Sequence, residues 1–237
     1  MRRVWLVIAS ASLVATTLFG CGRENYEKRL SNTLTKLEYE RRVKKNLMPA
    51  ANEKKFTDLA IYLQTPKDEA QAKAGQLPVG EGQFDLDASF LDPKADAVLH
   101  VLARVKQPKK PPTKGAAPAP ALPPRGDFNA EVINTLATQF GASDNLAITK
   151  FKEETKRGNR FKRLMFNAND KDVEVWSLKQ DNHEVALIFV YDPKLKAALS
   201  SKVQLTLETF AVGPKATRNF SGGAAEEEAD AGAPIPL

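Results

Sequence analysis

The sequence predicts an α+β domain in which a mainly antiparallel sheet is flanked by helices and preceded by a charged N-terminal helix. Three observations support this prediction. Short stretches in both halves of the chain alternate apolar and polar residues or run apolar throughout, as strands do. Longer segments repeat apolar residues every three or four positions, as amphipathic helices do. The chain has 237 residues and one cysteine, so no disulfide framework can replace a hydrophobic core.

Residues 1–20 have the features of a secretory signal peptide: a basic start and then an uncharged run. That run is diluted by Ser and Thr and is shorter than the ~20 apolar residues of a membrane span. The sequence LFGC at residues 18–21 resembles the lipobox of bacterial lipoproteins, although Phe19 replaces the small or β-branched residue usual there. In that family the cysteine is lipidated and the signal is cleaved before it. The resemblance implies that Cys21 is a lipid anchor, with an incidental cysteine as the alternative.

A lipidated Cys21 would place the protein in the cell envelope, because several acyl chains hold a protein to a bilayer firmly. Gly22 stands where an aspartate signals inner-membrane retention in enterobacterial lipoproteins, which favours the periplasmic side of the outer membrane. The alternative is an uncleaved inner-membrane anchor. For an exported protein, nucleic acid is not an expected partner. The formal charge of +6 then indicates compatibility with anionic lipids or polymers, or ordinary solubility.

Residues 21–50 are expected to form a charged helical stalk after the anchor. Apolar residues recur in it at helical steps: Tyr26, Leu30, Leu34, Leu37, then Val43 and Leu47. Pro49 ends the pattern. The narrow stripe has two interpretations, packing against the protein's own domain or a short coiled-coil seam with a partner. The pattern lapses at Arg41 and Lys44, which favours the first.

The α+β domain itself is expected over residues 51–213. Its first half offers three strand candidates, at 56–63, 83–91 and 97–106, the second of which alternates cleanly. The proline-rich segment 106–126 follows and favours an extended, solvated polyproline conformation. We expect a loop inserted within one domain, and the alternative is a linker between two domains.

The second half of the domain begins with a helix that Asp127 caps and Gly141 ends. Short turns then join three strands, which predicts an antiparallel meander: 161–168, 172–179 and 183–192. The Asp-Pro pair at 192–193 opens a closing helix with Gly213 past its end. Residues 214–237 are acidic and rich in small residues, and are expected to be a disordered tail.

The closing unit, residues 183–213, resembles the last strand and helix of the α/β/α fold shared by PsbP, the Ran-binding Mog proteins and small envelope lipoproteins such as DcrB. The family's terminal hydrophobic-Ser/Thr-Phe pattern is matched by LETF at 207–210. The order of the other elements agrees, but the proline-rich insertion is not typical. Members share no common enzymatic activity, so the resemblance implies an α/β/α sandwich that acts as a binding or assembly factor.

The residue types that bind metals are not spaced to do so. Four polar residues take positions of a calcium loop: Asp85, Asp87, Ser89 and Asp96. The position that must turn sharply is Phe90 and not glycine, so a strand with a solvated face explains the segment better. His100 and His183 lie in predicted strands without a partner at metal-ligand spacing, and we interpret them as ordinary strand residues. No metal or other cofactor is expected.

The densest basic stretch, residues 150–163, is the candidate binding surface, and we expect it to form a helix end or turn that leads into the next strand. Its cations are Lys150, Lys152, Lys156, Arg157, Arg160, Lys162 and Arg163. Anionic lipid or an acidic polymer would suit it, and the acidic tail could fold back onto it. The alternative is a solvated face without a partner.

Trp176 is interpreted as a core residue, or as the lining of a groove if its side of the sheet is uncovered.

These observations predict a non-catalytic, membrane-anchored envelope lipoprotein that presents a binding or assembly surface to another protein or an envelope polymer. The sequence contains no phosphate loop, dinucleotide fingerprint or nucleophile elbow. The alternatives are an envelope hydrolase whose site assembles in space and a carrier of an apolar ligand.

Overall fold

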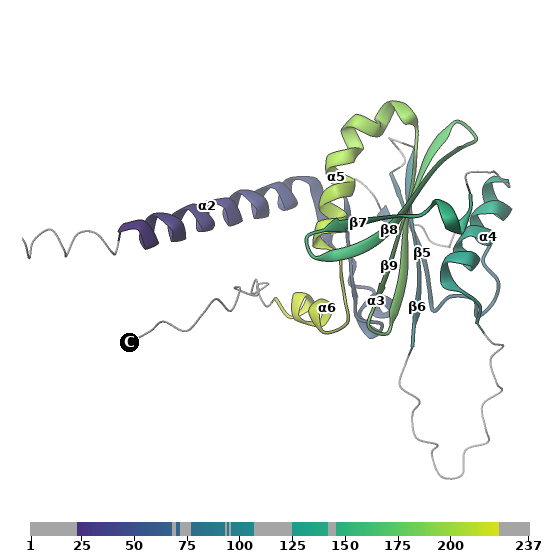
Figure 1. Cartoon of the computed structure of the whole chain (residues 1–237), viewed down its shortest axis with the longest axis horizontal. Coiled ribbons are helices and arrows are strands. Elements are labelled where there is room, and N and C mark those ends of the chain that lie inside the picture. Colours follow the sequence, from purple (N-terminus) through teal and green to yellow (C-terminus); the bar gives the residue numbers. More distant parts are fainter. Residues whose placement is uncertain are drawn as a thin grey trace, which may run out of the picture. The chain divides into compact units, whose positions relative to one another are not determined.

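The computed structural model describes most of the chain: residues 23–67, 70–71, 77–92, 94, 96–106, 125–141 and 146–222. The predicted signal peptide, Cys21, the centre of the proline-rich segment and the acidic residues of the expected tail lie outside these ranges. The chain divides into two compact units after Lys45 (Figure 1). Among the helices described, none combines the length and apolar character needed to cross a membrane.

The first unit is the predicted charged helix, α2 (Arg23–Asn46). Lys44 and Lys45 lie in its last turn, where cations interact favourably with the helix dipole. Its apolar stripe is exposed, with exposed fractions between 46% and 66%: Tyr26, Leu30, Leu34 and Leu37. The helix therefore presents an apolar line on a charged surface.

A seven-stranded antiparallel sheet forms the centre of the second unit and confirms the predicted fold class. In spatial order the strands are β4 (Ala70–Gln71), β5 (Leu86–Asp92), β6 (Ala97–Val105), β10 (His183–Tyr191), β9 (Lys171–Gln180), β8 (Asn159–Ala168) and β7 (Lys152–Lys156). The strands β7 to β10 form a meander, which includes the three strands predicted. Leu187 in β10 stands between Val101 of β6 and Trp176 of β9, so β10 is a central strand.

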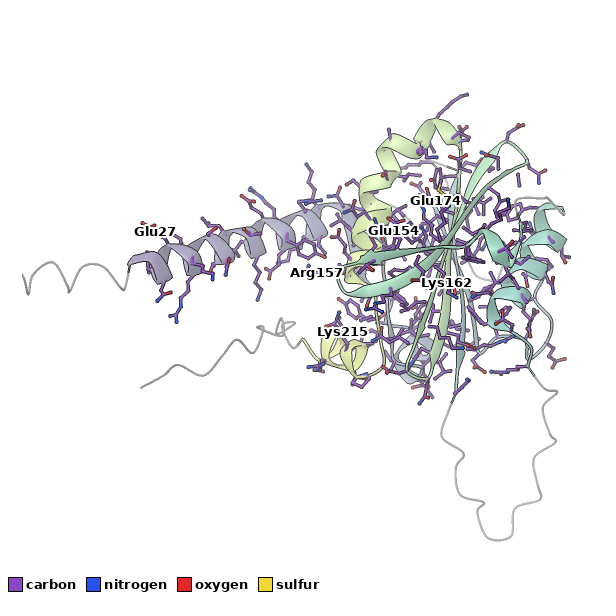
Figure 2. All side chains as sticks on the ribbon, viewed as in Figure 1. Glu27, Glu154, Arg157, Lys162, Glu174 and Lys215 are labelled. Atoms are coloured by element: carbon purple, nitrogen blue, oxygen red, sulfur yellow. The ribbon has the colours of Figure 1, made fainter. Side chains whose placement is uncertain are left out.

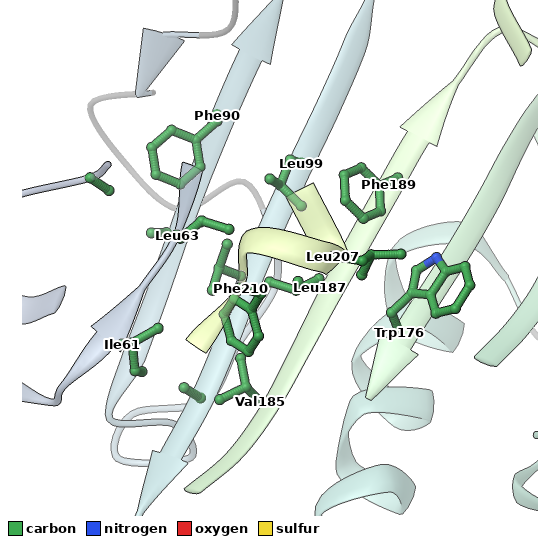
Figure 3. Packing of buried hydrophobic residues seen from close by; sticks show 14 of the residues in the cluster. Ile61, Leu63, Phe90, Leu99, Trp176, Val185, Leu187, Phe189, Leu207 and Phe210 are labelled. Carbon is green, nitrogen blue, oxygen red and sulfur yellow. The ribbon is translucent and has the colours of Figure 1, made fainter. Parts of the chain in front are cut away.

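Helices cover both faces of this sheet. On one face, α5 (Lys196–Thr209) packs through Leu207 against Leu187 (Figure 3). Phe56 of the short helix α3 (Lys54–Asp58) belongs to the same core. On the other face, α4 (Phe128–Phe140) packs through Leu136 against Ile188. Successive residues of β10 thus enter two separate cores, which explains why this strand is apolar on both faces.

The helix after Asp127 forms as expected. The expected closing helix forms too, but it ends at Thr209, and Gly213 begins a further helix and does not only follow the last one. Asp127 accepts a hydrogen bond from the Ala130 amide and caps α4, and Gly141, with φ +87°, follows its end. The short helix η2 (Pro193–Leu195), whose Lys194 amide donates to the Asp192 carboxylate, leads into α5. A further short helix, η1 (Ile148–Lys150), precedes β7.

The segment 56–63 was expected to be a strand, and this was wrong. It forms the end of α3 and then β2 (Ile61–Tyr62), which pairs with β11 (Ala211–Val212). Phe56 and Leu59 are three residues apart, a helical spacing, and Ala60 turns the chain with φ +49°. The apolar side chains reach the same core by either route, so their pattern alone did not distinguish the two structures.

The folded unit extends beyond the expected boundaries of 51 and 213. At its start β1 (Leu47–Ala50) pairs with β3 (Gln64–Pro66). At its end α6 (Gly213–Phe220) occupies the first residues assigned to the tail. Ala216 is fully buried there, and the Phe220 ring meets Tyr62 at a centroid distance of 5.2 Å. Two apolar residues at a four-residue spacing are therefore enough to dock this short helix.

Candidate binding surface on the β7–β8 hairpin

The basic stretch 150–163 includes the end of η1 at Lys150 and a turn that leads into β8, as expected, but the strand β7 between them was not expected, and the stretch forms a β-hairpin. The strands β7 and β8 pair from Lys152 opposite Arg163 to Lys156 opposite Asn159. Arg157 and Gly158 make the two-residue turn, with φ +45° and +84°, which suits a hairpin connection. The strand β7 was missed because all five of its residues are polar, and Lys and Glu also favour helices. The Arg-Gly pair was the available signal for the turn.

The hairpin distributes its cations over both faces of the sheet. Arg163 stands opposite Lys152 on β7 and Trp176 on β9, so these residues share the face that α5 covers. Lys162 alternates with Arg163 and points to the opposite face, as does Arg160. Figure 2 labels Arg157 at the tip of the hairpin. It also labels Glu154 on β7, Lys162 on β8 and Glu174 on β9.

Trp176 is a core residue and not the lining of an open groove. Its side chain is 2% exposed, and its ring meets Phe161 edge-on at a centroid distance of 6.0 Å. The Arg163 guanidinium lies 4.7 Å from the ring centroid and the Lys156 ammonium 5.6 Å from it. Both distances suit cation–π contacts. The two cations therefore cover the part of the ring that the apolar core does not.

Two glutamates neutralise these two cations. Glu154 lies 2.6 Å from Lys156 and 3.3 Å from Arg163, while Glu174 lies 3.1 Å from Arg163. Partial burial raises the pKa of Glu154, but the hydrogen bonds and charges of Lys156 and Arg163 outweigh burial and hold that pKa below its usual value. The result is a compact, charge-balanced network that fixes β7 to the sheet.

Glu174 is the buried centre of this network. It also accepts hydrogen bonds from the indole N–H of Trp176, at 3.3 Å, and from the Tyr191 hydroxyl. Burial and the bond to Glu174 raise the pKa of Tyr191. The carboxylate thus has three kinds of donor, which accounts for its tolerance in an apolar environment. Lys156, Arg163 and Trp176 are consequently structural residues in this geometry.

The remaining five cations are exposed, and we call them the cationic hairpin surface: Lys150, Lys152, Arg157, Arg160 and Lys162. The structure thus brings the predicted residues together on one hairpin but separates them into two groups. One group is neutralised around Trp176, and the other faces solvent. Glu153 is the exposed acidic residue among them.

A serine and a histidine meet on β5 and β6, but not in a catalytic arrangement. Ser89 Oγ lies 2.8 Å from His100 Nδ1, and the residues are 1% and 4% exposed. Burial lowers the pKa of His100 to about 4. A nucleophile needs access to its substrate, and this hydroxyl has almost none. The pair therefore satisfies two buried polar groups and does not support the hydrolase alternative.

Three of the other candidate ligands, Asp85, Asp96 and His183, have partners of their own, whereas the buried Asp87 Oδ1 has none within the described residues. The Asp85 carboxylate accepts hydrogen bonds from both Nη atoms of Arg125, at 2.7 and 2.9 Å. Asp96 forms an ion pair with Lys171. His183 lies in β10, with Nε2 2.9 Å from the Leu59 carbonyl. Among the described residues, no three side chains of the metal-binding types converge on one point.

An open hollow of about 570 Å³ lies where the β8–β9 turn approaches the start of η2. Five of its seven lining residues are polar or charged: Asn167, Asn169, Asp170, Asp192 and Lys194, beside Ala168 and Pro193. A carrier of an apolar ligand would instead enclose it between apolar side chains. The hollow does not support the carrier alternative.

Comparison with known proteins finds likeness only among solved structures. No family model matches the chain, and no curated protein is detectably similar. The solution structure of cyanobacterial PsbP (CyanoP) from Synechocystis sp. PCC 6803 is similar at a TM-score of 0.42 and 10% identity, over 71% of this chain and 93% of that one. A crystal structure from Bacteroides thetaiotaomicron is similar at a TM-score of 0.37 and 10% identity, over 65% of this chain and 45% of that one. This chain thus spans less than half of the Bacteroides protein, and neither likeness bears on function.

Proposed function

We propose that this protein is a non-catalytic envelope lipoprotein whose α+β domain presents the cationic hairpin surface to another protein. The observation that carries the proposal is the separation of the hairpin cations into two groups. A neutral network around Trp176 holds the hairpin in place, and five cations that this network does not use face solvent. Such an arrangement presents charge from a rigid base, which limits the entropy lost on binding.

The shape of the surface favours a protein over a flat membrane. Lys152 points to one face of the sheet, whereas Arg160 and Lys162 point to the other. A planar bilayer could meet one of these sets closely but not both at once. An extended acidic chain that passes along the hairpin could contact both. An envelope polymer is the other member of this anionic class and becomes an outcome of the experiment below.

The anchoring part of the proposal rests on the sequence. The lipobox-like motif at 18–21 supports lipidation of Cys21 and export to the envelope, with the periplasmic side of the outer membrane favoured by Gly22. Lipidation would confine the domain to a thin layer above the bilayer. The hairpin would then meet its partner at a raised effective concentration.

Cross-linking and pull-down from intact cells test the proposal. The native chain is compared with Cys21→Ala, which removes the anchor, and with the triple variant K152E/R160E/K162E. A control triple variant, K54E/K194E/R218E, changes the net charge equally at exposed positions away from the hairpin. We expect one defined protein to be captured by the native chain and the control, and lost from both other variants. Capture that is unchanged by the hairpin triple variant would contradict the proposal, and recovery of a polymer in place of a protein would change the partner.

A further inference from the structure

The strand β7 is the last strand of the seven-stranded sheet and is hydrogen-bonded on one side only, to β8. The pair Lys156 and Asn159 closes a two-residue turn and is therefore a hydrogen-bonded pair. Because bonded and non-bonded pairs alternate, Glu154 and Lys152 also bond to β8, whereas the backbone groups of Glu153 and Thr155 point away from it. Within the described residues no hydrogen bond reaches these outward groups.

This edge is held in place by side-chain contacts, and its two outward-facing residues, Glu153 and Thr155, are exposed. The alternate residues of the strand are held by side-chain contacts: Glu154 forms ion pairs with Lys156 and Arg163, and Lys156 lies over the Trp176 ring. Phe151 packs against the α4-side core just before the strand begins. A fixed edge of this kind offers its free N–H and C=O groups without further ordering, which favours the addition of a strand.

The charges around the edge decide which chain can add to it. Lys150 precedes the strand β7, Lys152 is its first residue, and Arg157 follows its end. Arg160 and Lys162 lie on the neighbouring strand β8. The exposed acidic residue of the edge is Glu153, so the five cations outnumber it, and a second copy of this hairpin would bring the same excess of positive charge and be repelled. Edge lysines protect sheets from such self-pairing. An acidic strand meets the opposite condition, because cross-strand pairs of opposite charge are favourable.

We infer that the free edge of β7 receives an extended acidic segment of the partner protein as an added strand. Main-chain hydrogen bonds to Glu153 and Thr155 would supply affinity, and the cationic hairpin surface would select for acidic side chains. This inference rests on the proposed function, since it specifies how the same surface holds its partner.

Thr155→Pro tests the inference directly. The amide of Thr155 points away from β8, so proline removes the outward donor without removing a bond of the hairpin, and edge strands accept proline. Thr155→Val is the matched control, because it keeps the amide and the preference for strand. The probe is a synthetic peptide of about ten residues that alternates glutamate with valine or threonine, compared with its glutamine counterpart. Binding is measured by fluorescence anisotropy on the full chain in detergent.

We expect the acidic peptide to bind the native chain and the valine variant equally, and the proline variant at least tenfold more weakly. We also expect the peptide to slow hydrogen exchange at the amides of residues 153 and 155. Near-ultraviolet circular dichroism checks that the proline variant is folded. If that variant is not folded, Glu153→Pro, which removes the other outward-pointing amide donor, is used in its place.

Other outcomes separate this inference from the proposed function. If K152E/R160E/K162E abolishes peptide binding and neither proline variant weakens it, the cations bind the partner through side chains alone, and the strand addition is overturned. If no variant weakens binding, both ideas are overturned. If deletion of residues 223–237 speeds exchange at residues 153 and 155 in the protein alone, the chain's own tail occupies the edge and the assignment to a partner is overturned.

Discussion

Arg104 and Arg163 lie on opposite faces of the sheet, and each stacks on an aromatic ring while pairing with a glutamate. Arg104 lies 5.2 Å from the Phe84 ring centroid and 5.6 Å from that of Phe128, and it pairs with Glu131. Arg163 stacks on Trp176 as described above. Their side chains are 3% and 30% exposed, respectively. The same chemistry therefore serves at two depths, and the depth decides what each arginine does.

The deeper cluster, around Arg104, holds three segments of the chain together. Arg104 donates to the carbonyl oxygens of Gln83, at 2.8 Å, and Gly126, at 3.1 Å, as well as to Glu131 in the first turn of α4. It thus ties the loop before β5 and the start of α4 to the end of β6. The shallower cluster ties one edge hairpin to the sheet and leaves the outer groups of that hairpin available. Burial makes the first arginine structural, and partial exposure allows the second to support a binding surface.

The largest effect is expected from Arg104→Met. The substitution keeps an apolar stem between Phe84 and Phe128 but removes the donor to the carbonyl oxygens of Gln83 and Gly126 and the cation that pairs with Glu131. Breaking a buried ion pair on one side costs about 3–5 kcal/mol of unfolding free energy. Urea denaturation measures the loss. Arg125→Met is the control: that arginine is 31% exposed in its pair with Asp85, and exposed pairs contribute about 1 kcal/mol or less. Equal losses in the two variants would contradict the distinction by depth.

An effect almost as large is expected from His100 as the pH falls. The histidine is neutral in the folded protein because burial lowers its pKa from 6.5 to about 4. The unfolded chain takes up the proton first, so stability is complete above pH 6.5 and falls as the pH drops from 6.5 to 4. The shift corresponds to about 3 kcal/mol. Denaturation at several pH values, with His100→Gln as the control, should show this slope only in the native chain. A slope that persists in the variant would place the titration elsewhere.

The hairpin cluster titrates in a different range, which sharpens the comparison. Glu154 has a pKa below its usual 4.5, so its contribution is present above that pH and is lost as the pH falls below it. Because this carboxylate is partly exposed, its contribution is screened by solvent. Acidification should therefore weaken the interior around His100 before it loosens the hairpin.

The sequence predicted those parts of the fold in which the apolar pattern is compatible with only one type of secondary structure. The helix after Asp127, the strands around Val175 and Leu187, and the closing helix all bury one defined set of side chains, and all were located. The segment 56–63 was assigned wrongly because both a helix and a strand bury Phe56 and Ile61. Among the missed elements was β7, since an edge strand of polar residues buries too little to leave a periodic pattern.

The candidate site was predicted in part for a related reason. Counting charges found the basic stretch at 150–163, but a count does not show which cations belong to the network around Trp176. The register of β7, β8 and β9 brings Arg163 over Trp176 and beside Glu174, and this pairing separates the neutralised cations from the exposed ones. Glu174 itself was not singled out, because one acidic residue in an apolar strand gives no pattern. Contacts between strands that are distant in sequence hold this information.

The smallest of these effects on stability is expected from Arg163→Met, the same change as at Arg104 but at the shallower cluster. Glu174 would keep its bonds from Trp176 and Tyr191, so the loss should be about 1–2 kcal/mol. The local consequence should be larger than the global one. The amide of Glu154 should exchange its hydrogen faster, because β7 loses part of its attachment to the sheet. Arg160→Met, on the same strand but facing the opposite side, is the matched control and should change neither quantity. If Arg163→Met costs as much as Arg104→Met, the depth of burial does not set the role of these arginines. If exchange at Glu154 is unchanged, the network around Trp176 does not hold the edge, and the rigid base that the proposed binding surface requires must come from elsewhere.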